Sequence, residues 1–469
     1  MSHDFIRARR LPHVSALALA FCLALLLLAA LGRVDPAHAQ GDDAAGAHVI
    51  VQFDDTASIV RTVGFTPSVS GLELLTLSGL DVITSATEYG TSVCAIQGVG
   101  CPAEDCFCQC ADGDTCRYWG YFNWDAAGWT AYDVGADASV ITQTGAVEGW
   151  LWGEFGMAMT PITPTLAAAR ALAALSLAQQ TSGIGSATNA VDTMLAIGAN
   201  QQRAQAWTTP DGSPLSALMA GVTRYTRAPS ISPAAAGKIA LATVATDACW
   251  PLATRMPMDY YDPALQAYSE FAGINAWAML GTLALGEPVP ADAVATLKAA
   301  IQPDGGWEWM TGFGSDSNST ALAIQALVGA GEPVSATEVI SGLVYLASTQ
   351  NADGGFSYDA NAPATRQSDT NSTAYVVQAL RAAGETVDGP DWQTDAGNTP
   401  TDFLLAMQRE DGLFAWQPGG DANTLATQQA IPALLGHTFP LKDVFAPTPG
   451  VDLCRGAYLP IALPGQSAP

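Results

Sequence analysis

The sequence predicts a multidomain α and β protein, with a small disulfide-rich β (α+β) domain over residues 47–154 and an α/α toroid of about six helical hairpins over residues 160–440. Three observations predict this architecture. Residues 47–154 alternate between apolar and polar positions in the period of a strand. Six cysteines lie close together in the same region. After residue 160, segments rich in Ala and Leu repeat at a regular interval, which is typical of stacked helical hairpins.

The first domain is predicted from short strands over 48–53, 81–84, 91–96, 117–124, 128–132 and 145–152, with a short helix over 70–78. Aromatic residues are dense in its second half. The strand period places Trp119 and Tyr121 on one face and Phe122 with Trp124 on the other. One face should therefore form the core, and the other should contact the neighbouring domain or stack on a flat ligand.

The cysteines predict an oxidising compartment. Disulfides are expected for an even cluster in an exported protein, whereas the alternative, a zinc site, usually shows a Cys-x2–4-Cys spacing that the tighter Cys106-x-Cys108-x-Cys110 run lacks. Six cysteines allow several pairings, which the sequence leaves open. No metal site is predicted. The disulfide candidates are Cys94, Cys101, Cys106, Cys108, Cys110 and Cys116, with Cys249 and Cys454 as a further possible pair.

The second domain is predicted from two repeated motifs. The segment Ser315–Leu327 matches Ser368–Leu380, and Asp421-Ala-Asn-Thr repeats its beginning. A Gln-x3-Gly-x-aromatic turn precedes two of these copies, at 350–356 and 408–414, and a shorter form lies at 302–307. Glycines allow a sharp reversal of the chain there. One unit is therefore a helix, a turn, a polar cap and a second helix, and a regular series of such units suggests a closed ring of inner and outer helices.

The two ends of the chain predict export. Residues 1–39 combine a basic start, an unbroken apolar run over Ser15–Leu31 and a small-x-small cleavage pattern at Ala37–Ala39, as a signal peptide does. An uncleaved membrane anchor is the alternative. No later apolar stretch is long enough to span a bilayer. Residues 441–469 form a C-terminal tail, either for surface retention or for docking on the body. The protein is thus expected to be secreted or to lie at the cell surface.

The composition excludes one large class of partners. The 469 residues carry 18 Lys and Arg against 44 Asp and Glu, a formal net charge of −26. A nucleic-acid-binding protein needs a basic face, so no nucleic acid is expected as a partner. Many of the acids lie in the turns and caps of the repeats, which predicts a mouth of the toroid that disfavours strongly anionic substrates.

These motifs resemble two known groups of proteins. The Gln…Gly-aromatic turns resemble the repeats of prenyltransferases and squalene/terpenoid cyclases, which share the α/α toroid. The N-terminal region, with Tyr118-Trp119 and the segment Gly145–Trp150, resembles the β-domain of transcobalamin and intrinsic factor. Those carriers hold a corrinoid between a β-domain and a toroid, although their domains come in the opposite order. This second resemblance implies a cobalamin-like corrinoid as the ligand.

The candidate ligand-binding residues are polar caps and aromatic side chains. Ser, Asp and Asn at helix starts commonly cap free N–H groups, and this structural role is the alternative for each of them. If the inner helices begin at one mouth, the same side chains could form a polar rim for a ligand. The candidates are Asp316, Asn318, Asp369, Asn371, Asp421, Asn423, Trp309, Tyr358, Trp416, Trp119 and Tyr121.

No catalytic residue is predicted. The toroid lacks an Asp-x-Asp-Asp acid, a zinc triad and a thioester motif, so whether the protein is an enzyme stays open, with the balance against catalysis. The leading hypothesis is a secreted or cell-surface binding protein that holds a small flat, corrinoid-like ligand between the toroid mouth and the β-domain. The alternatives are a surface scaffold or adhesion protein that contacts a cell-surface partner, and a terpenoid-cyclase- or lyase-type enzyme.

Overall fold

The computed structural model describes residues 45–53, 58–88, 90–110, 116–125, 128–143, 145–159, 163–182, 187–202, 207, 231–246, 256–360 and 366–441. The predicted signal peptide, the tail after residue 441, Cys249 and Cys454 lie outside the described residues. None of the helices within these ranges is long and apolar enough to cross a bilayer.

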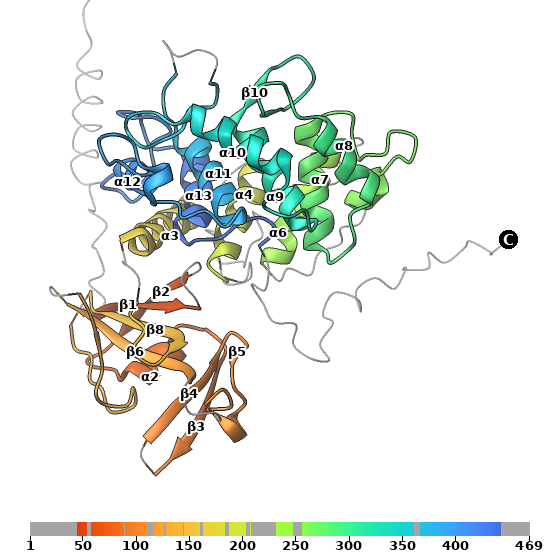
Figure 1. The fold of residues 1–469 in the computed structure, drawn as a ribbon. Helices are drawn as coiled ribbons and strands as arrows, with labels where there is room; N and C mark the ends of the chain where they lie inside the picture. The colour runs from red at the N-terminus through yellow and green to blue at the C-terminus, as the bar shows by residue number, and fades with distance from the viewer. Residues whose placement is uncertain are drawn as a thin grey trace, which may run out of the picture.

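The described residues of the N-terminal domain form two sheets, the short helix α2 and the 3-10 helix η1 (Figure 1). In the five-stranded sheet the order is β2-β1-β8-β6-β7, and β1 runs parallel to β8 while the other neighbours are antiparallel. Helix α2 begins after Ser70, whose hydroxyl accepts the N–H of Glu73. The elements are β1 (Ala45–Gln52), β2 (Ser58–Phe65), α2 (Gly71–Leu77), β3 (Val82–Thr87), β4 (Gly90–Ile96), β5 (Val99–Gly100), η1 (Ala103–Asp105), β6 (Arg117–Asp125), β7 (Gly128–Ala131) and β8 (Val147–Glu154).

Both faces of the five-stranded sheet are covered. On one face Trp119 packs against Trp152 at 5.6 Å between ring centroids and belongs to the core of the β-domain. On the other face Phe122 and Leu151 join the core of the helical domain. The prediction that one face is core and the other contacts the neighbouring domain is therefore confirmed. The resemblance to the transcobalamin β-domain stays a prediction.

Three disulfides join the six clustered cysteines, as the sequence predicts. They pair Cys94 with Cys106, Cys101 with Cys108 and Cys110 with Cys116. Cys94 lies on β4, and the other five cysteines lie in the segments that follow β5 and η1, up to the residue before β6. Short covalent loops thus stabilise a region that is too small to bury a large apolar core of its own.

Six helices of the second domain form a closed ring (Figure 1). Each packs against the next along the chain, and the last packs against the first. Gly237 and Gly281 bring two of them into backbone contact, since a Cβ at Gly237 would lie 2.0 Å from the carbonyl oxygen of Trp277. The ring helices are α4 (Ala187–Ala199), α6 (Pro233–Ala245), α7 (Ala272–Ala284), α9 (Ser317–Gly329), α11 (Thr370–Ala382) and α13 (Thr424–Leu434).

Outer helices pack against the outside of this ring. Within the described residues they are four, so the predicted number of about six hairpins is not confirmed. The outer helices are α3 (Thr163–Ser182), α8 (Ala291–Ala299), α10 (Thr337–Thr349) and α12 (Pro400–Ala406), and the short elements between them are η3 (Pro257–Tyr260), β9 (Trp307–Glu308), β10 (Ser315–Asp316) and η4 (Pro390–Trp392).

The repeated turns place a buried aromatic residue under the start of each following ring helix. The backbone N–H groups of Trp307, Phe356 and Phe414 donate to threonine hydroxyls in the first turns of α9, α11 and α13, at 2.9, 3.0 and 2.9 Å. All three aromatic side chains are fully buried. The turn and the helix start are therefore one rigid unit, which explains why the two motifs repeat together.

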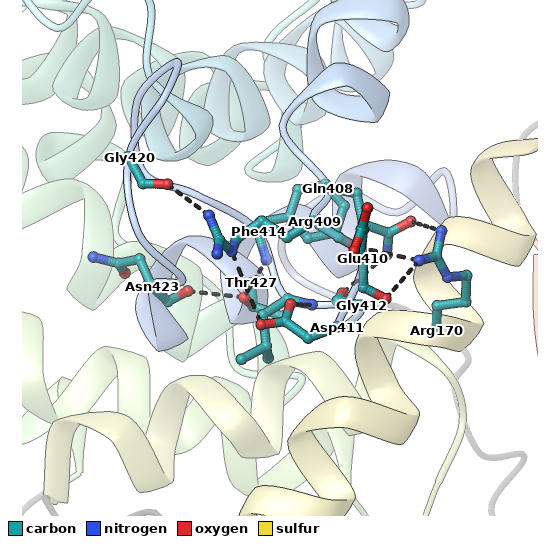
Figure 2. A network of polar contacts seen from close by, with 11 residues as sticks. Arg170, Gln408, Arg409, Glu410, Asp411, Gly412, Phe414, Gly420, Asn423 and Thr427 are labelled. Carbon is teal, nitrogen blue, oxygen red and sulfur yellow. Dashed lines mark hydrogen bonds and ion pairs between the residues drawn. The ribbon is translucent and has the colours of Figure 1, made fainter.

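The last repeated turn packs against α3, the first helix of the helical domain (Figure 2). The side-chain amide of Gln408 donates to the carbonyl of Ala167 at 2.8 Å and to that of Gly412 at 3.0 Å. Arg170, on α3, donates to the carbonyls of Arg409 and Glu410, both at 3.2 Å. The glutamine of the motif thus bridges its own turn to the neighbouring helix.

The β-domain docks on the end of the ring where the ring helices finish. The side chain of Asn200, just after α4, pairs with both backbone groups of Val60 as a strand would, at 2.8 and 2.9 Å. The buried Arg61 donates to the carbonyls of Asn200 and Gln201, and the N–H of Ser58 donates to Leu435. The polar caps begin the ring helices at the opposite end, where β10 lies in Figure 1. The expectation that the β-domain roofs this mouth is therefore wrong.

Candidate functional site

A pocket of about 500 Å³ opens at the N-terminal ends of α9, α11 and α13. Its volume falls within the range of small-molecule sites. Two buried carboxyl groups and several aromatic rings share it with amide and hydroxyl groups. The lining residues are Trp277, Trp309, Asp316, Asn318, Ser319, Leu322, Tyr358, Asp369, Asn371, Ser372, Tyr375, Trp416, Asn423, Leu425 and Gln429.

The two carboxyl groups occupy equivalent positions in successive repeats. Asp316 caps α9, and its Oδ1 accepts the N–H of Ser319 at 2.7 Å. Asp369 caps α11, and its Oδ1 accepts the N–H of Ser372 at 2.8 Å. Only 2% and 4% of the two residues is exposed. Burial raises the pKa of both carboxyl groups, because the charged form loses its hydration.

The second oxygens of these carboxyl groups differ. In Asp369, Oδ2 accepts a hydrogen bond from the hydroxyl of Ser372 at 2.8 Å. In Asp316, Oδ2 is buried and has no hydrogen bond of full geometry among the described residues, although a polar interaction with the Tyr358 hydroxyl offsets part of the rise in the pKa of this carboxyl. The Asp369 carboxyl is thus satisfied as a helix cap on both oxygens. The Asp316 carboxyl keeps one oxygen available, and its raised pKa favours a proton on it.

Aromatic residues form the rim and the floor of the pocket. Tyr358 and Trp416 at the rim are half exposed. Burial, with the nearby charge of Asp316, raises the pKa of Tyr358 to about 12. Trp277 and Tyr375 are buried at the floor, with ring centroids 6.3 Å apart in an edge-to-face arrangement. Such faces can stabilise a positive charge inside a cavity that excludes water.

The structure brings eight of the eleven predicted ligand-binding residues to this pocket. That they bind a ligand stays a prediction. In the third repeat it is Asn423, not Asp421, that caps α13, and Asp421 is exposed and outside the lining. The eight residues are Asp316, Asn318, Asp369, Asn371, Asn423, Trp309, Tyr358 and Trp416.

Trp119 and Tyr121 do not reach the pocket and are corrected to core residues of the β-domain. Trp119 is 6% exposed within that core. Tyr121 stacks on Trp150 at 4.7 Å and donates its hydroxyl to Glu148 at 2.6 Å. Their face of the sheet packs beneath α2 instead of facing the toroid, which satisfies the Tyr121 hydroxyl, buries Trp119 and partly buries Tyr121.

The sequence did not predict the two aromatic residues at the floor of the pocket. Trp277 and Tyr375 lie in the middle of apolar helical segments, where an aromatic residue is expected to be core. The one sequence signal for them is their position, since Tyr375 follows the Asp369 cap by less than two turns of helix.

Within the described ranges, no group of three His, Cys, Asp or Glu side chains comes close enough together to hold a metal ion.

No protein-family model matches the chain. Two curated relatives match part of it, and both are named drimenyl diphosphate synthase. The protein from Streptantibioticus cattleyicolor is 33% identical over 192 residues, which make up 37% of this chain and 34% of the relative. The protein from Streptomyces showdoensis is 27% identical over 180 residues, which make up 37% and 32%. The chain therefore spans about a third of the length of these relatives.

Solved structures overlap with the chain only loosely. The type II terpene cyclase MstE from Scytonema has a TM-score of 0.40 and 14% identity, over 58% of this chain and 97% of that one. The ent-copalyl diphosphate synthase from Streptomyces platensis has a TM-score of 0.36 and 16% identity, over 53% and 50%. The ring described above follows from the helix contacts of this chain.

The predicted role as a non-catalytic carrier is wrong, because the curated relatives are named as synthases. The geometry also contradicts the prediction that a flat ligand is held between the toroid mouth and the β-domain. The pocket lies at the end of the ring where α9 and α11 begin, and the β-domain docks at the end where α4 and α13 finish. The terpenoid-cyclase alternative fits the relatives better.

Proposed function

We propose that the protein is an enzyme of the terpenoid-cyclase type, which protonates an unsaturated isoprenoid chain in the pocket and converts it to a cyclic isomer. The observation that carries the proposal is the Asp316 carboxyl, which is buried among aromatic rings and keeps one oxygen without a hydrogen bond of full geometry from the described residues. The names of the two partial relatives support the same substrate class.

The proposed reaction begins with a proton transfer to carbon. A π bond of the substrate takes the proton of the Asp316 carboxylic acid, so that a C–H bond forms, the O–H bond breaks and a carbocation faces a carboxylate. A second double bond attacks the cation and closes a ring. Loss of a proton from a neighbouring carbon to water then ends the reaction, and the Asp316 carboxylate takes up a proton from water, so the product is an isomer of the substrate.

The pocket offers what such a cation needs. Trp277, Trp309 and Tyr375 line the pocket, and an aromatic face turned toward a cation contributes roughly 0.5–2 kcal/mol when water is excluded. Leu322 and Leu425 add apolar surface for a hydrocarbon chain. The side chain of Asn371 is held by Gln429 at 2.6 Å, so the amide groups at the wall stay in place beside the reactive centre.

Asp316 fits only the first position of the acid motif that protonating cyclases use. The starts of α9 and α11 read Asp316-Ser-Asn-Ser and Asp369-Thr-Asn-Ser, so the third and fourth positions of Asp-x-Asp-Asp are not acidic. The proposal therefore assigns the proton to the first residue of the motif, on the basis of burial and hydrogen bonding in this chain.

The test is a product analysis. Purified protein is incubated with farnesol and with farnesyl diphosphate, and the extracts are examined by gas chromatography with mass spectrometry. Cyclic isomers of either compound, absent from boiled enzyme, are the expected result. Recovery of only unchanged or hydrolysed starting material from both would contradict the proposal.

We also propose that the protein acts after export. The three disulfides are expected to persist in an oxidising compartment and to be reduced in the cytosol. The signal-like sequence of residues 1–39 supports the same location. Fractionation of cells that produce the protein, with intact mass measurement of its N-terminus, tests this: a cytosolic protein that retains residues 1–39 would contradict export.

A further inference from the structure

A second cavity lies on the other side of the pocket floor. It has a volume of about 680 Å³ and is lined by the ends of α9 and α11 together with the segment that follows α13. Leu322 lines the first pocket and Gln325 the second, on the same helix. At the rise of an α-helix these residues are roughly 4.5 Å apart along the axis, so the two cavities are separated by about one turn.

Two aromatic rings stand at this boundary. Trp277 belongs to the lining of the first pocket and Phe439 to that of the second. Their ring centroids are 5.8 Å apart with a tilt of 45°. Both side chains are buried, at 5% exposure each. The contact between them is therefore a partition across the inside of the ring.

A hydrogen bond from its backbone N–H holds Phe439 in this position. After α13 ends, the chain turns back under the ring, and the N–H of Phe439 donates to Oε1 of the fully buried Gln325 at 2.8 Å. Gly329, in the last turn of α9, lies close to the ring of Pro440, since a Cβ added there would be 3.5 Å from Pro440 Cδ. The segment thus inserts one aromatic side chain from the end of the ring opposite the mouth.

We propose that Phe439 is a specificity-determining residue that sets the maximum length of the substrate chain. This inference depends on the proposed function, since it concerns the hydrocarbon end that enters the pocket furthest from the mouth. With Phe439 in place, the chain must end at Trp277. Without the Phe439 ring, the Trp277 indole loses the side chain packed behind it and can shift into the vacated space, so the first pocket becomes deeper at its floor.

The test compares binding of two prenyl alcohols, which needs no catalysis. Dissociation constants for farnesol and the longer geranylgeraniol are measured by calorimetry with the full-length protein and with Phe439→Ala. The variant Phe155→Ala is the matched control, because Phe155 is 85% exposed in the β-domain and lines neither cavity. The expected result is that only Phe439→Ala shifts the ratio of the two constants toward geranylgeraniol, by about tenfold or more.

Each outcome has a defined meaning. An unchanged ratio in a folded Phe439→Ala protein would overturn the role of Phe439 and leave the proposed function intact. Absence of binding of both alcohols to the unmodified protein would overturn the proposed function as well. If circular dichroism shows that Phe439→Ala is unfolded, Phe439→Leu takes its place, and a shift in the same direction is expected because the smaller side chain still opens the boundary.

Discussion

The substitution Asp316→Asn separates the two roles that the Asp316 side chain plays. An asparagine keeps Oδ1, the atom that accepts the N–H of Ser319 at 2.7 Å and caps α9. It removes the acidic proton from Oδ2, which lies buried in the pocket without a hydrogen bond of full geometry from the described residues. The variant should therefore lose the chemistry and keep the fold.

The expected magnitudes differ strongly between the two roles. Loss of a general acid typically lowers kcat by about 10²–10⁴-fold. Asn and Asp are nearly equal as N-caps, so the free energy of unfolding should change by less than about 1 kcal/mol. A large fall in activity with little change in stability is the signature of an acid that also caps a helix.

The pH dependence has a defined sign. Burial raises the pKa of the Asp316 carboxyl above its value in the unfolded chain. The protonated form is therefore favoured by folding, so this contribution to stability is complete below the unfolded pKa and is lost as pH rises through the folded pKa. Activity should fall over the same upward range, since the carboxylate has no proton to donate, and Asp316→Asn should remove this dependence of stability.

The assay measures the initial rate at which cyclic product forms and the urea concentration at the midpoint of unfolding. Both are measured for Asp316→Asn and for its matched control, Asp369→Asn. The control changes the equivalent cap in the next repeat, whose Oδ2 is already bonded to Ser372 at 2.8 Å, and should keep most of the activity. Full activity in Asp316→Asn, or a loss confined to Asp369→Asn, would refute the assignment of the proton to Asp316.

Three further predictions concern the β-domain and its docking. Arg61→Ala should lower the free energy of unfolding by about 2–3 kcal/mol in urea titrations, because the carbonyls of Asn200 and Gln201 lose a buried charged donor; an unchanged midpoint would contradict this. Reduction of the disulfides, which close loops of 12, 7 and 6 residues, should cost about 2.2–2.8 kcal/mol each by loop entropy and lower the melting temperature of the β-domain, with ligand affinity in the toroid unaffected. Burial raises the pKa of Glu148, so the stability of the unmodified protein should decrease as pH rises through that pKa, and Glu148→Gln should flatten the profile.

The sequence was a good guide to features that depend on neighbouring residues. A helix cap is a contact over three residues, so Asp316 and Asp369 could be placed at helix starts from the motif alone. The turn motif also carries its own hydrogen bonds. The error at Asp421 arises because the third copy is offset, and only the backbone shows that Asn423 caps the helix.

Features that join distant parts of the chain could not be predicted. The docking of the β-domain depends on hydrogen bonds between Val60 and Asn200, which are 140 residues apart. The same contact decides which end of the ring is open, and hence that the β-domain leaves the mouth uncovered. Trp119 was misplaced for a related reason, since a strand pattern identifies two faces but does not say which one α2 will cover.

The measurement that tests the central claim most directly is the reaction in deuterium oxide. The proton on the Asp316 carboxyl exchanges with solvent, so protonation of the substrate should place one deuterium on a carbon atom of every cyclic product molecule, and the mass spectrum should shift by one unit relative to the product made in ordinary water. Cyclic product without this shift would contradict a reaction that begins with proton transfer from the enzyme to carbon.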